Sequence, residues 1–326
     1  MKKPNVYVTR QIPQPAIDEL KTVCDVEINL LDEVLSKSEL LKKVHGRDAV
    51  LCLLTDAIND SVFEAAGSQC RIFANYAVGF NNVDVAAATK HGVIITNTPG
   101  VLTDATADLA WALMFSVARR IPAADKFTRD GKFHGWGPMM FLGRDVTKKT
   151  LGVIGAGRIG SNFMKKAKGF EMNLLYYDVQ KNAEFEAETG AKYVSKDILL
   201  KESDFISVHV PLLPETRHMI SKREFCLMKS TTILINTSRG PVVDEKALVE
   251  ALKTGCIWGA GLDVYENEPL IEPGLIELEN AVIVPHIASA TIETRTNMGL
   301  IAVRNIIAVM SGKSPMNCVN PEVLKR

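Results

Sequence analysis

The first part of the chain, residues 1–102, alternates between apolar runs and segments with helical spacing. Runs such as "DAVLCLL", "RIFANYAV" and "VIITNTPG" have the apolar character of strands buried on both faces of a sheet. Segments such as "AIDELKTV" and "NDSVFEAAG" indicate helices, and the second of them ends on a helix-stopping glycine. Alternating strands and helices predict a parallel sheet covered on both faces, so we expect a complete α/β domain here.

A second alternating series begins at Thr150. Its expected strands are "LGVIG", "NLLYYD", "AKYV", "FISVHV", "TTILINTS", "WGAGLDVY" and "AVIVPH". The clearest helix between them is "DEKALVEALKTG", with Asp244 as its N-cap and Gly255 just past its end. This series predicts a second α/β domain, so the expected fold class is α/β with two doubly wound parallel sheets.

Three segments lie outside both series. The first, "TADLAWALMFSVARRI", is predicted to be one long helix, and its several apolar faces indicate burial between two bodies. The second, "RDGKFHGWGPMMFLGRDVTKK", mixes glycines, aromatic residues and charges, and we expect an irregular excursion. The third, "TIETRTNMGLIAVRNIIAVMSG", is expected to be a helix with no strand after it. If this helix returns to the first domain, the second domain is inserted within the first.

The motif "GAGRIG" follows the apolar run "LGVI" and precedes a helix. Gly155 permits a tight turn, Gly157 lets the backbone approach a pyrophosphate, and Gly160 lets the helix pack on the strand. Asp178 ends the next strand, 18 residues after Gly160, where an acidic side chain can bind the hydroxyl groups of a ribose. Phosphates are attracted to the helix N-terminus. The motif therefore predicts a dinucleotide site, and the Asp178 carboxylate favours NAD over NADP.

Charge and cysteine content argue against several classes of protein. The chain has 326 residues, and its 38 Lys and Arg balance its 38 Asp and Glu, which argues against a nucleic-acid or membrane-surface partner. The six cysteines form no C-x-x-C pair, and no signal-like apolar run opens the sequence. We therefore expect reduced thiols in a soluble cytoplasmic protein, with no metal site.

Ligands of doubly wound sheets bind beyond the carboxyl ends of the strands. The polar residues expected there include Arg239 in "ILINTSRG", Glu268 in "GLDVYENEP" and His286 in "AVIVPHIASA". An arginine can hold a carboxylate by two bonds, a neutral histidine can exchange a proton, and a carboxylate behind the ring steadies its cation. Beside a nicotinamide cofactor, this set can interconvert a 2-keto acid and a 2-hydroxy acid. The residue pattern alone does not choose His286 over His209 as the acid/base.

Several specific motifs occur in one order over nearly the whole chain. They are "AVGFNNVDV", "VIITNTPG", "TADLAWALM", "TLGVIGAGRIG", "SVHVPLLPETRHMI", "ILINTSRGPVVDEKALVEAL", "GAGLDVYENEP" and "VPHIASAT". Together they resemble the D-isomer-specific 2-hydroxyacid dehydrogenase family, most closely its glyoxylate and hydroxypyruvate reductase branch. The resemblance implies NAD(P)H-dependent reduction of a short 2-keto acid to the D-2-hydroxy acid. Two alternatives stay open: another keto acid such as 2-ketogluconate, or a dinucleotide-sensing, corepressor-like binding module.

The resemblance also implies roles for individual residues. Arg239 would grip the substrate carboxylate, His286 would be the acid/base, and Glu268 would be its carboxylate partner. Backbone N–H groups of Val78 and Gly79 would also meet the carboxylate. The remaining assignments are Trp136, as a substrate-binding aromatic that reaches toward a neighbouring subunit's site, and Asp263, as the group that positions the nicotinamide amide. The full expected cofactor set is Thr106, Gly155, Ala156, Gly157, Arg158, Ile159, Gly160, Asp178, Val210, Pro211, Thr216, Thr237, Ser238, Asp263 and His286.

By the same resemblance, one domain is Rossmann-like and the other flavodoxin-like. Residues 103–285 would be the dinucleotide-binding domain, inserted in a substrate (catalytic) domain made of residues 1–102 plus 286–326, with the reaction taking place in the cleft between them. A homodimer is implied as well. We expect the helix from about Thr106 to Ile121 and the loop around Trp136 near its interface.

Overall fold

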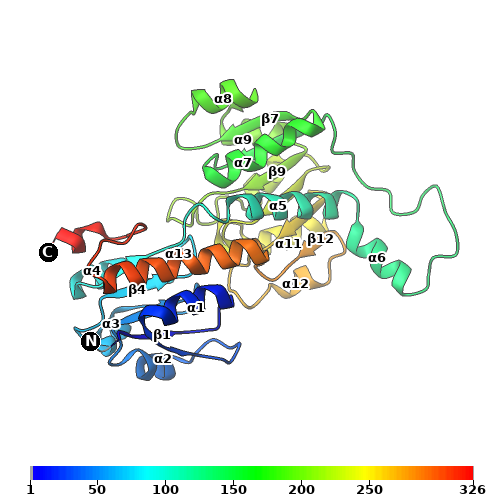
Figure 1. The fold of residues 1–326 in the computed structure, drawn as a ribbon. Helices are drawn as coiled ribbons and strands as arrows, with labels where there is room; N and C mark the ends of the chain where they lie inside the picture. The colour runs from blue at the N-terminus through cyan, green and yellow to red at the C-terminus, as the bar shows by residue number, and fades with distance from the viewer. Residues whose placement is uncertain (1–2, 326) are drawn as a thin grey trace. The chain divides into compact units, whose positions relative to one another are not determined.

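The computed structural model describes residues 3–325. The chain divides into two compact units, with the divisions after Leu102 and after Ala288. The first unit is discontinuous in sequence, because its last part follows the whole of the second unit. The arrangement of each unit can be followed in Figure 1.

The first unit is built on a parallel sheet of five strands. The strands are β1 (Asn5–Val8), β2 (Asp25–Ile28), β3 (Ala49–Cys52), β4 (Ile72–Asn75) and β5 (Ile94–Thr96). Their spatial order is β2-β1-β3-β4-β5, and every neighbouring pair is parallel. This is the flavodoxin-like order of a doubly wound sheet, so the fold predicted for this unit is confirmed.

Helices cover both faces of this sheet. They are α1 (Gln14–Val23), α2 (Lys37–Val44), α3 (Asp60–Ala66), α4 (Val85–His91) and α13 (Ile292–Met310), with a 3₁₀ turn at Pro321–Lys325. Residues of β3 alternate: Ala49 and Leu51 pack with α1 and α13, whereas Val50 and Cys52 pack with α2, α3 and α4. Burial on both faces explains why this strand is a continuous apolar run.

The helix α13 returns to the first unit after the second has been completed. It lies beside α1, and Figure 1 draws the two in orange and blue. Gly299 permits this close approach, because a Cβ there would come within 2.8 Å of the Ala16 Cβ. The expected return of the last helix to the first domain is therefore confirmed.

The second unit contains a parallel sheet of seven strands. The strands are β6 (Thr150–Ile154), β7 (Asn173–Tyr177), β8 (Lys192–Tyr193), β9 (Phe205–Val208), β10 (Ile233–Asn236), β11 (Gly259–Leu262) and β12 (Ala281–Ile283). Their order is β12-β11-β10-β9-β6-β7-β8. The chain starts in the middle, winds to one edge and then to the other, which is the Rossmann-like order.

Two hydrophobic cores lie on the two faces of this sheet. The helices are α5 (Thr103–Ala118), α6 (Ile121–Arg129), α7 (Arg158–Lys166), α8 (Ala183–Thr189), α9 (Lys196–Glu202), α10 (Lys222–Leu227), α11 (Glu245–Lys253) and α12 (Pro273–Ile276), with 3₁₀ turns at Ala167–Phe170 and Gly240–Val242. Helices α5 and α7 contribute to one core, and α9, α10 and α11 contribute to the other. None of the helices within residues 3–325 is long and apolar enough to cross a membrane.

The segment expected to form one long helix is instead broken after Ala118. Pro122 lies in the first turn of the next helix, α6, where its missing N–H costs nothing. A continuous helix would place the Pro122 ring against the Ala118 carbonyl. That carbonyl instead accepts a hydrogen bond from the Arg144 backbone N–H at 2.8 Å. Between Arg129 and Thr150 there is no helix or strand, and this arm projects from the unit in Figure 1.

Candidate active site

Three residues with expected roles at the site follow adjacent strands of the second unit. Arg239 comes after β10, Asp263 directly follows β11, and His286 comes after β12. Because these strands are neighbours and parallel, their carboxyl ends meet along one edge of the sheet. Glu268 lies on the loop that follows β11 and completes the group.

Arg239 is held by a buried asparagine that the sequence reasoning missed. Asn236, which is 1% exposed, donates from its side-chain amide to the Arg239 carbonyl at 3.0 Å. Its oxygen accepts from the Ser238 backbone N–H and hydroxyl at 3.0 and 2.7 Å. Gly240 lets this turn approach the next loop, because a Cβ there would lie 1.9 Å from the Tyr265 backbone. Burial lowers the pKa of Arg239, while the negative charge of Glu268 opposes that effect.

His286 and Glu268 form a direct pair. Nδ1 of His286 lies 2.9 Å from Oε2 of Glu268, and the other carboxylate oxygen accepts from the Tyr265 N–H at 3.0 Å. Burial alone would raise the pKa of Glu268, but the hydrogen bond and charge of His286, the Tyr265 N–H and the charge of Arg239 together outweigh it, so the pKa is lowered. No hydrogen bond among the described residues engages Nε2 of His286. The ring therefore has a carboxylate on one side and a proton-exchanging nitrogen at its tip.

Asp263 fixes the backbone that follows His286. Its carboxylate oxygens accept from the N–H groups of Ile287 and Ala288 at 2.6 and 2.9 Å. His286 has φ = +52°, a conformation that few non-glycine residues adopt. Burial raises the pKa of Asp263, although these N–H groups and the charge of His286 act against the rise. Asp263 therefore holds the loop that carries His286, a contact that the expected role at the nicotinamide amide did not include.

The other histidines have different surroundings. Burial lowers the pKa of His209 to about 3, and its Nε2 lies 2.8 Å from the Ser207 hydroxyl, so the ring is a poor proton carrier near neutral pH. His218 pairs with Glu266, and His91 pairs with Asp60 on the surface. His45 bonds a backbone carbonyl, and His134 lies exposed in the arm. Among the six histidines, all of which the structure describes, His286 alone pairs with a carboxylate that also interacts electrostatically with Arg239.

The glycine loop after β6 has the shape that a pyrophosphate needs. Gly155 has φ = +92°, and a Cβ there would come within 2.9 Å of the His209 and Val210 backbone. A Cβ on Gly160 would lie 2.0 Å from the Gly155 carbonyl oxygen. A Cβ on Gly157 would meet nothing within 4 Å, so the helix N-terminus faces open space there. The loop therefore fits a dinucleotide, and the exposed Arg158 follows Gly157 at the same place.

Asp178 lies against this glycine loop. Its Oδ2 accepts from the Ala156 N–H at 2.7 Å, and its Oδ1 accepts from the Val179 N–H at 2.6 Å. Each oxygen retains a lone pair for a ribose hydroxyl. Lys181 does not extend toward the carboxylate, because its Nζ bonds Glu186 at 3.1 Å.

The remaining expected cofactor residues lie in the second unit as well. The Thr216 hydroxyl ties its loop together by donating to the Pro211 carbonyl at 2.7 Å. The Thr237 hydroxyl is buried and has no hydrogen-bond partner among the described residues, as expected of a group that bonds a ligand. Among the described residues, the side chain of Thr106, which is buried in α5, has no hydrogen bond of its own. Ile159 and Val210 are apolar residues that are partly buried.

The expected substrate residues do not all lie in the same unit as His286. Val78 and Gly79 follow β4 in the first unit. Trp136 lies in the arm with 85% of its surface exposed, and none of the ring contacts within residues 3–325 includes it. The structure therefore brings together Arg239, Glu268 and His286, but it does not bring Trp136 to them.

The comparisons with known proteins identify the family of the chain. Residues 111–288 match the family model described as "D-isomer specific 2-hydroxyacid dehydrogenase, NAD binding domain". The chain belongs to the D-isomer specific 2-hydroxyacid dehydrogenase family, and it is an oxidoreductase that uses a nicotinamide dinucleotide. The family predicted from the motifs is therefore confirmed.

Individual relatives resemble the chain over its full length. The glyoxylate reductase of Thermococcus litoralis is 50% identical over 326 residues, which cover 99% of this chain and 98% of that protein. Among solved structures, a protein from Thermus thermophilus is 41% identical with a TM-score of 0.90, covering 97% of this chain and 99% of that chain. A glyoxylate reductase from Paecilomyes thermophila is 32% identical with a TM-score of 0.86, covering 99% and 100%.

Proposed function

We propose that this protein reduces glyoxylate and similar short 2-keto acids, such as hydroxypyruvate, to the corresponding D-2-hydroxy acids. The observation that carries the proposal is the His286–Glu268 pair, whose carboxylate also interacts electrostatically with Arg239. An acid/base beside a carboxylate-binding cation is what reduction of a keto acid requires. The names of the relatives favour glyoxylate as the substrate.

In the proposed reaction, Arg239 binds the substrate carboxylate and polarises the keto oxygen. His286, protonated and steadied by Glu268, donates a proton from Nε2 to that oxygen. A reduced nicotinamide, when bound, would supply the hydride for the keto carbon. Asp263 holds the His286 loop in place through the two backbone N–H groups that follow the histidine.

A panel of substrates tests this proposal. The protein is mixed with NADH and glyoxylate, hydroxypyruvate, pyruvate or 2-ketogluconate, and nicotinamide absorbance is followed. We expect the highest kcat/KM with glyoxylate or hydroxypyruvate. A preference for 2-ketogluconate would change the proposed substrate but not the proposed reaction. Binding of NADH without turnover of any acid would favour the corepressor-like alternative.

The proposed cofactor is NAD, with NADP as the poorer alternative. The Asp178 carboxylate is fixed by two backbone N–H groups at the glycine loop. It can accept bonds from the 2′ and 3′ hydroxyls of NAD, but it would repel the 2′-phosphate of NADP. Lys181 is the nearest cation in sequence, and its bond to Glu186 leaves it poorly placed to compensate. A preference of roughly 100-fold corresponds to about 2.7 kcal/mol.

The cofactor proposal is tested by replacing the carboxylate. Asp178→Ser should raise kcat/KM for NADPH and lower it for NADH. Asp197→Ser is the matched control, because Asp197 lies in the same unit but pairs with Arg223. This control should leave the ratio unchanged. A wild-type preference for NADPH would contradict the placement of Asp178 at the ribose.

We also propose that the protein is a cytoplasmic homodimer and that the arm between α6 and β6 takes part in the contact. Four apolar side chains of the arm are more than half exposed: Phe133, Trp136, Met139 and Leu142. Exposed apolar groups at this density are typical of a contact surface. Most of α5, by contrast, is buried inside its own unit, so the apolar character of that helix needs no partner. The six cysteines are all free, in agreement with a reducing compartment.

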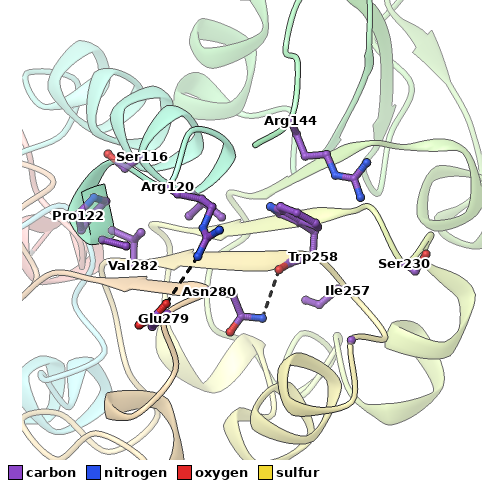
Figure 2. A pocket seen from close by; sticks show the side chains of 13 residues that line it. Ser116, Arg120, Pro122, Arg144, Ser230, Ile257, Trp258, Glu279, Asn280 and Val282 are labelled. Carbon is purple, nitrogen blue, oxygen red and sulfur yellow. Dashed lines mark hydrogen bonds and ion pairs between the residues drawn. The ribbon is translucent and has the colours of Figure 1, made fainter. Parts of the chain in front are cut away.

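A pocket lies at the base of the arm. It has a volume of about 530 Å³ and is lined by parts of α5, α6 and the segments before β11 and β12 (Figure 2). The Arg144 guanidinium lies over the Trp258 ring at 4.2 Å, and Arg120 pairs with Glu279 at 3.6 Å. Light scattering should give about 71 kDa, twice the 35.7 kDa chain. A monomer at micromolar concentration would contradict the proposal.

A variant pair sharpens the same test. Met139→Glu should weaken the dimer, because it places a charge in the exposed apolar arm. Met316→Glu, at a methionine that is equally exposed but lies in the first unit, should leave the dimer intact. If both variants behave alike, the arm is not part of the contact.

A further inference from the structure

The loop after β4 carries Val78 and Gly79, and its carbonyl groups are held from behind by two asparagines. The side-chain amide of Asn97 donates to the Val78 carbonyl at 2.8 Å. The side-chain amide of Asn75 donates to the Gly79 carbonyl at 3.0 Å. All of these residues lie in the first unit. Two consecutive carbonyls of one partly buried loop are thus fixed by side chains instead of by a neighbouring strand.

Because a peptide group is planar, a carbonyl that is held in place also fixes the direction of the next residue's N–H group. In a trans peptide the C=O of one residue and the N–H of the next point in opposite directions. The bond from Asn97 to Val78 therefore directs the Gly79 N–H away from Asn97, and the bond to Gly79 does the same for the Phe80 N–H. None of the N–H groups of Val78, Gly79 and Phe80 has a hydrogen-bond partner within the described part of the chain.

The two asparagines are themselves held in place. Asn75 is fully buried, and its side-chain oxygen accepts from the Asn82 amide at 3.3 Å. Asn82 also donates to the Leu53 carbonyl at 3.0 Å. Asn97 is tied through its backbone N–H to the Asn317 carbonyl at 3.3 Å. The Asn75 amide therefore has little freedom to turn, and Asn97 is anchored at its backbone.

We propose that Asn97 and Asn75 are positioning residues for recognition of the substrate carboxylate. They hold the Val78 and Gly79 carbonyls back, so that the N–H groups of the loop face an anion without any reorganisation when it binds. This inference rests on the proposed function and on the role that the family resemblance implies for the loop, whose N–H groups would meet the carboxylate of a keto acid. A carboxylate that accepts bonds from oriented backbone N–H groups is bound by charge-assisted hydrogen bonds.

Substitution of Asn97 tests the proposal, because this residue is only partly buried and its loss should not unfold the unit. In Asn97→Ala the Val78 peptide is free to rotate, and the KM for glyoxylate should rise about 10- to 100-fold. The carboxylate is bound equally in the substrate and in the transition state, so kcat should change much less. The KM for NADH should stay within about twofold. Asn97→Asp should raise the KM for glyoxylate further, since a second carboxylate would face the Val78 carbonyl.

Asn29→Ala is the matched control. Asn29 also donates its side-chain amide to a backbone carbonyl of the first unit, that of Thr9 at 3.1 Å, but it lies outside this loop. Its KM for glyoxylate should equal that of the wild type. The proposal is overturned if Asn97→Ala keeps a wild-type KM, or if both variants raise the KMs for glyoxylate and NADH together. A wild-type protein that reduces no keto acid would instead overturn the proposed function.

Discussion

Two histidine–carboxylate pairs of the second unit share almost every local feature. His286 pairs with Glu268 at 2.9 Å, and His218 pairs with Glu266 at 2.6 Å. Both histidines have a left-handed backbone, with φ of +52° and +50°. Both carboxylates come from the same short segment, "ENEP". A search for histidines with carboxylate partners would therefore return the two pairs as equals.

The difference between the pairs lies in which ring nitrogen is used. His286 bonds Glu268 through Nδ1, the nitrogen nearer its own backbone, so Nε2 stays at the tip of the ring. His218 uses Nε2 for Glu266, and the tip of that ring is occupied. Glu266 also has Arg217 at 3.5 Å, an exposed cation, whereas Glu268 acts on the half-buried Arg239. A histidine–carboxylate pair supports chemistry when the outer nitrogen and a substrate anchor both remain available.

The largest difference is expected from replacing each histidine. His286→Asn should lower kcat at least about 1,000-fold, because the proton donor is lost while the cofactor loop is untouched. His218→Asn should leave kcat within about twofold, since its ring holds only a surface loop. Turnover is measured by NADH absorbance, and NADH binding by fluorescence. The reverse pattern would make His218 the acid/base.

The next largest effect concerns the two arginines near the carboxylates. Arg239→Lys should lower kcat/KM about 100-fold, or about 2.7 kcal/mol, because lysine keeps the charge but loses the two-bond grip. Arg217→Lys should have no measurable effect. Steady-state kinetics with glyoxylate decides between them. Near-normal kinetics in Arg239→Lys would remove this residue from the proposed site.

A smaller effect, visible in the pH profile, is expected from the carboxylates. In Glu268→Gln the protonated ring loses its anionic partner, so the alkaline limb of kcat/KM for reduction should move to lower pH. Glu266→Gln should leave the profile where it is. An unchanged profile in Glu268→Gln would mean that the pair does not control the protonation of His286.

The smallest effect concerns acid stability. The pKa of Glu268 is lowered in the folded protein, so its ionisation stabilises the fold at neutral pH. That contribution is lost as the pH falls through the folded pKa. The difference in Tm between the wild type and Glu268→Gln should therefore shrink from pH 7 toward pH 3. Glu266→Gln, in the His218–Glu266 pair, should change the free energy of unfolding by at most about 1 kcal/mol, as is typical of ion pairs near the surface.

Much of the fold was predictable because burial on both faces leaves a clear mark in the sequence. Strands such as β3 and β10 are continuous apolar runs, and the glycine motif marks the start of the second sheet. The edge strand β2 was not among the expected strands, since its residues are partly exposed and carry two acidic side chains. The break after Ala118 was also missed, although Pro122 is the signal that could have revealed it.

The residues of the candidate site could be predicted from sequence motifs, but the contacts that hold them in place could not. Arg239, Glu268 and His286 could be named from their motifs, and their roles stay predictions. The supporting contacts could not be named, because some join residues far apart in sequence and others depend on the local conformation of a turn. The Asp263 carboxylate meets N–H groups more than twenty residues away, and Asn236 acts on a turn that looks ordinary in sequence. Which nitrogen of each histidine faces its carboxylate depends on backbone geometry that no local pattern encodes.

The return of α13 to the first unit sets an order for folding during synthesis. The core of that unit includes Met298, Ala302 and Ile306, which are made after the whole of the second unit. At a typical synthesis rate, roughly 10 to 40 seconds separate Leu102 from Ser289. The second unit draws its core only from its own residues, so it can fold during that interval. The part of the protein that leaves the ribosome first is thus the last to be completed, and its five-stranded sheet must stay soluble with one face lacking α13 until that helix arrives.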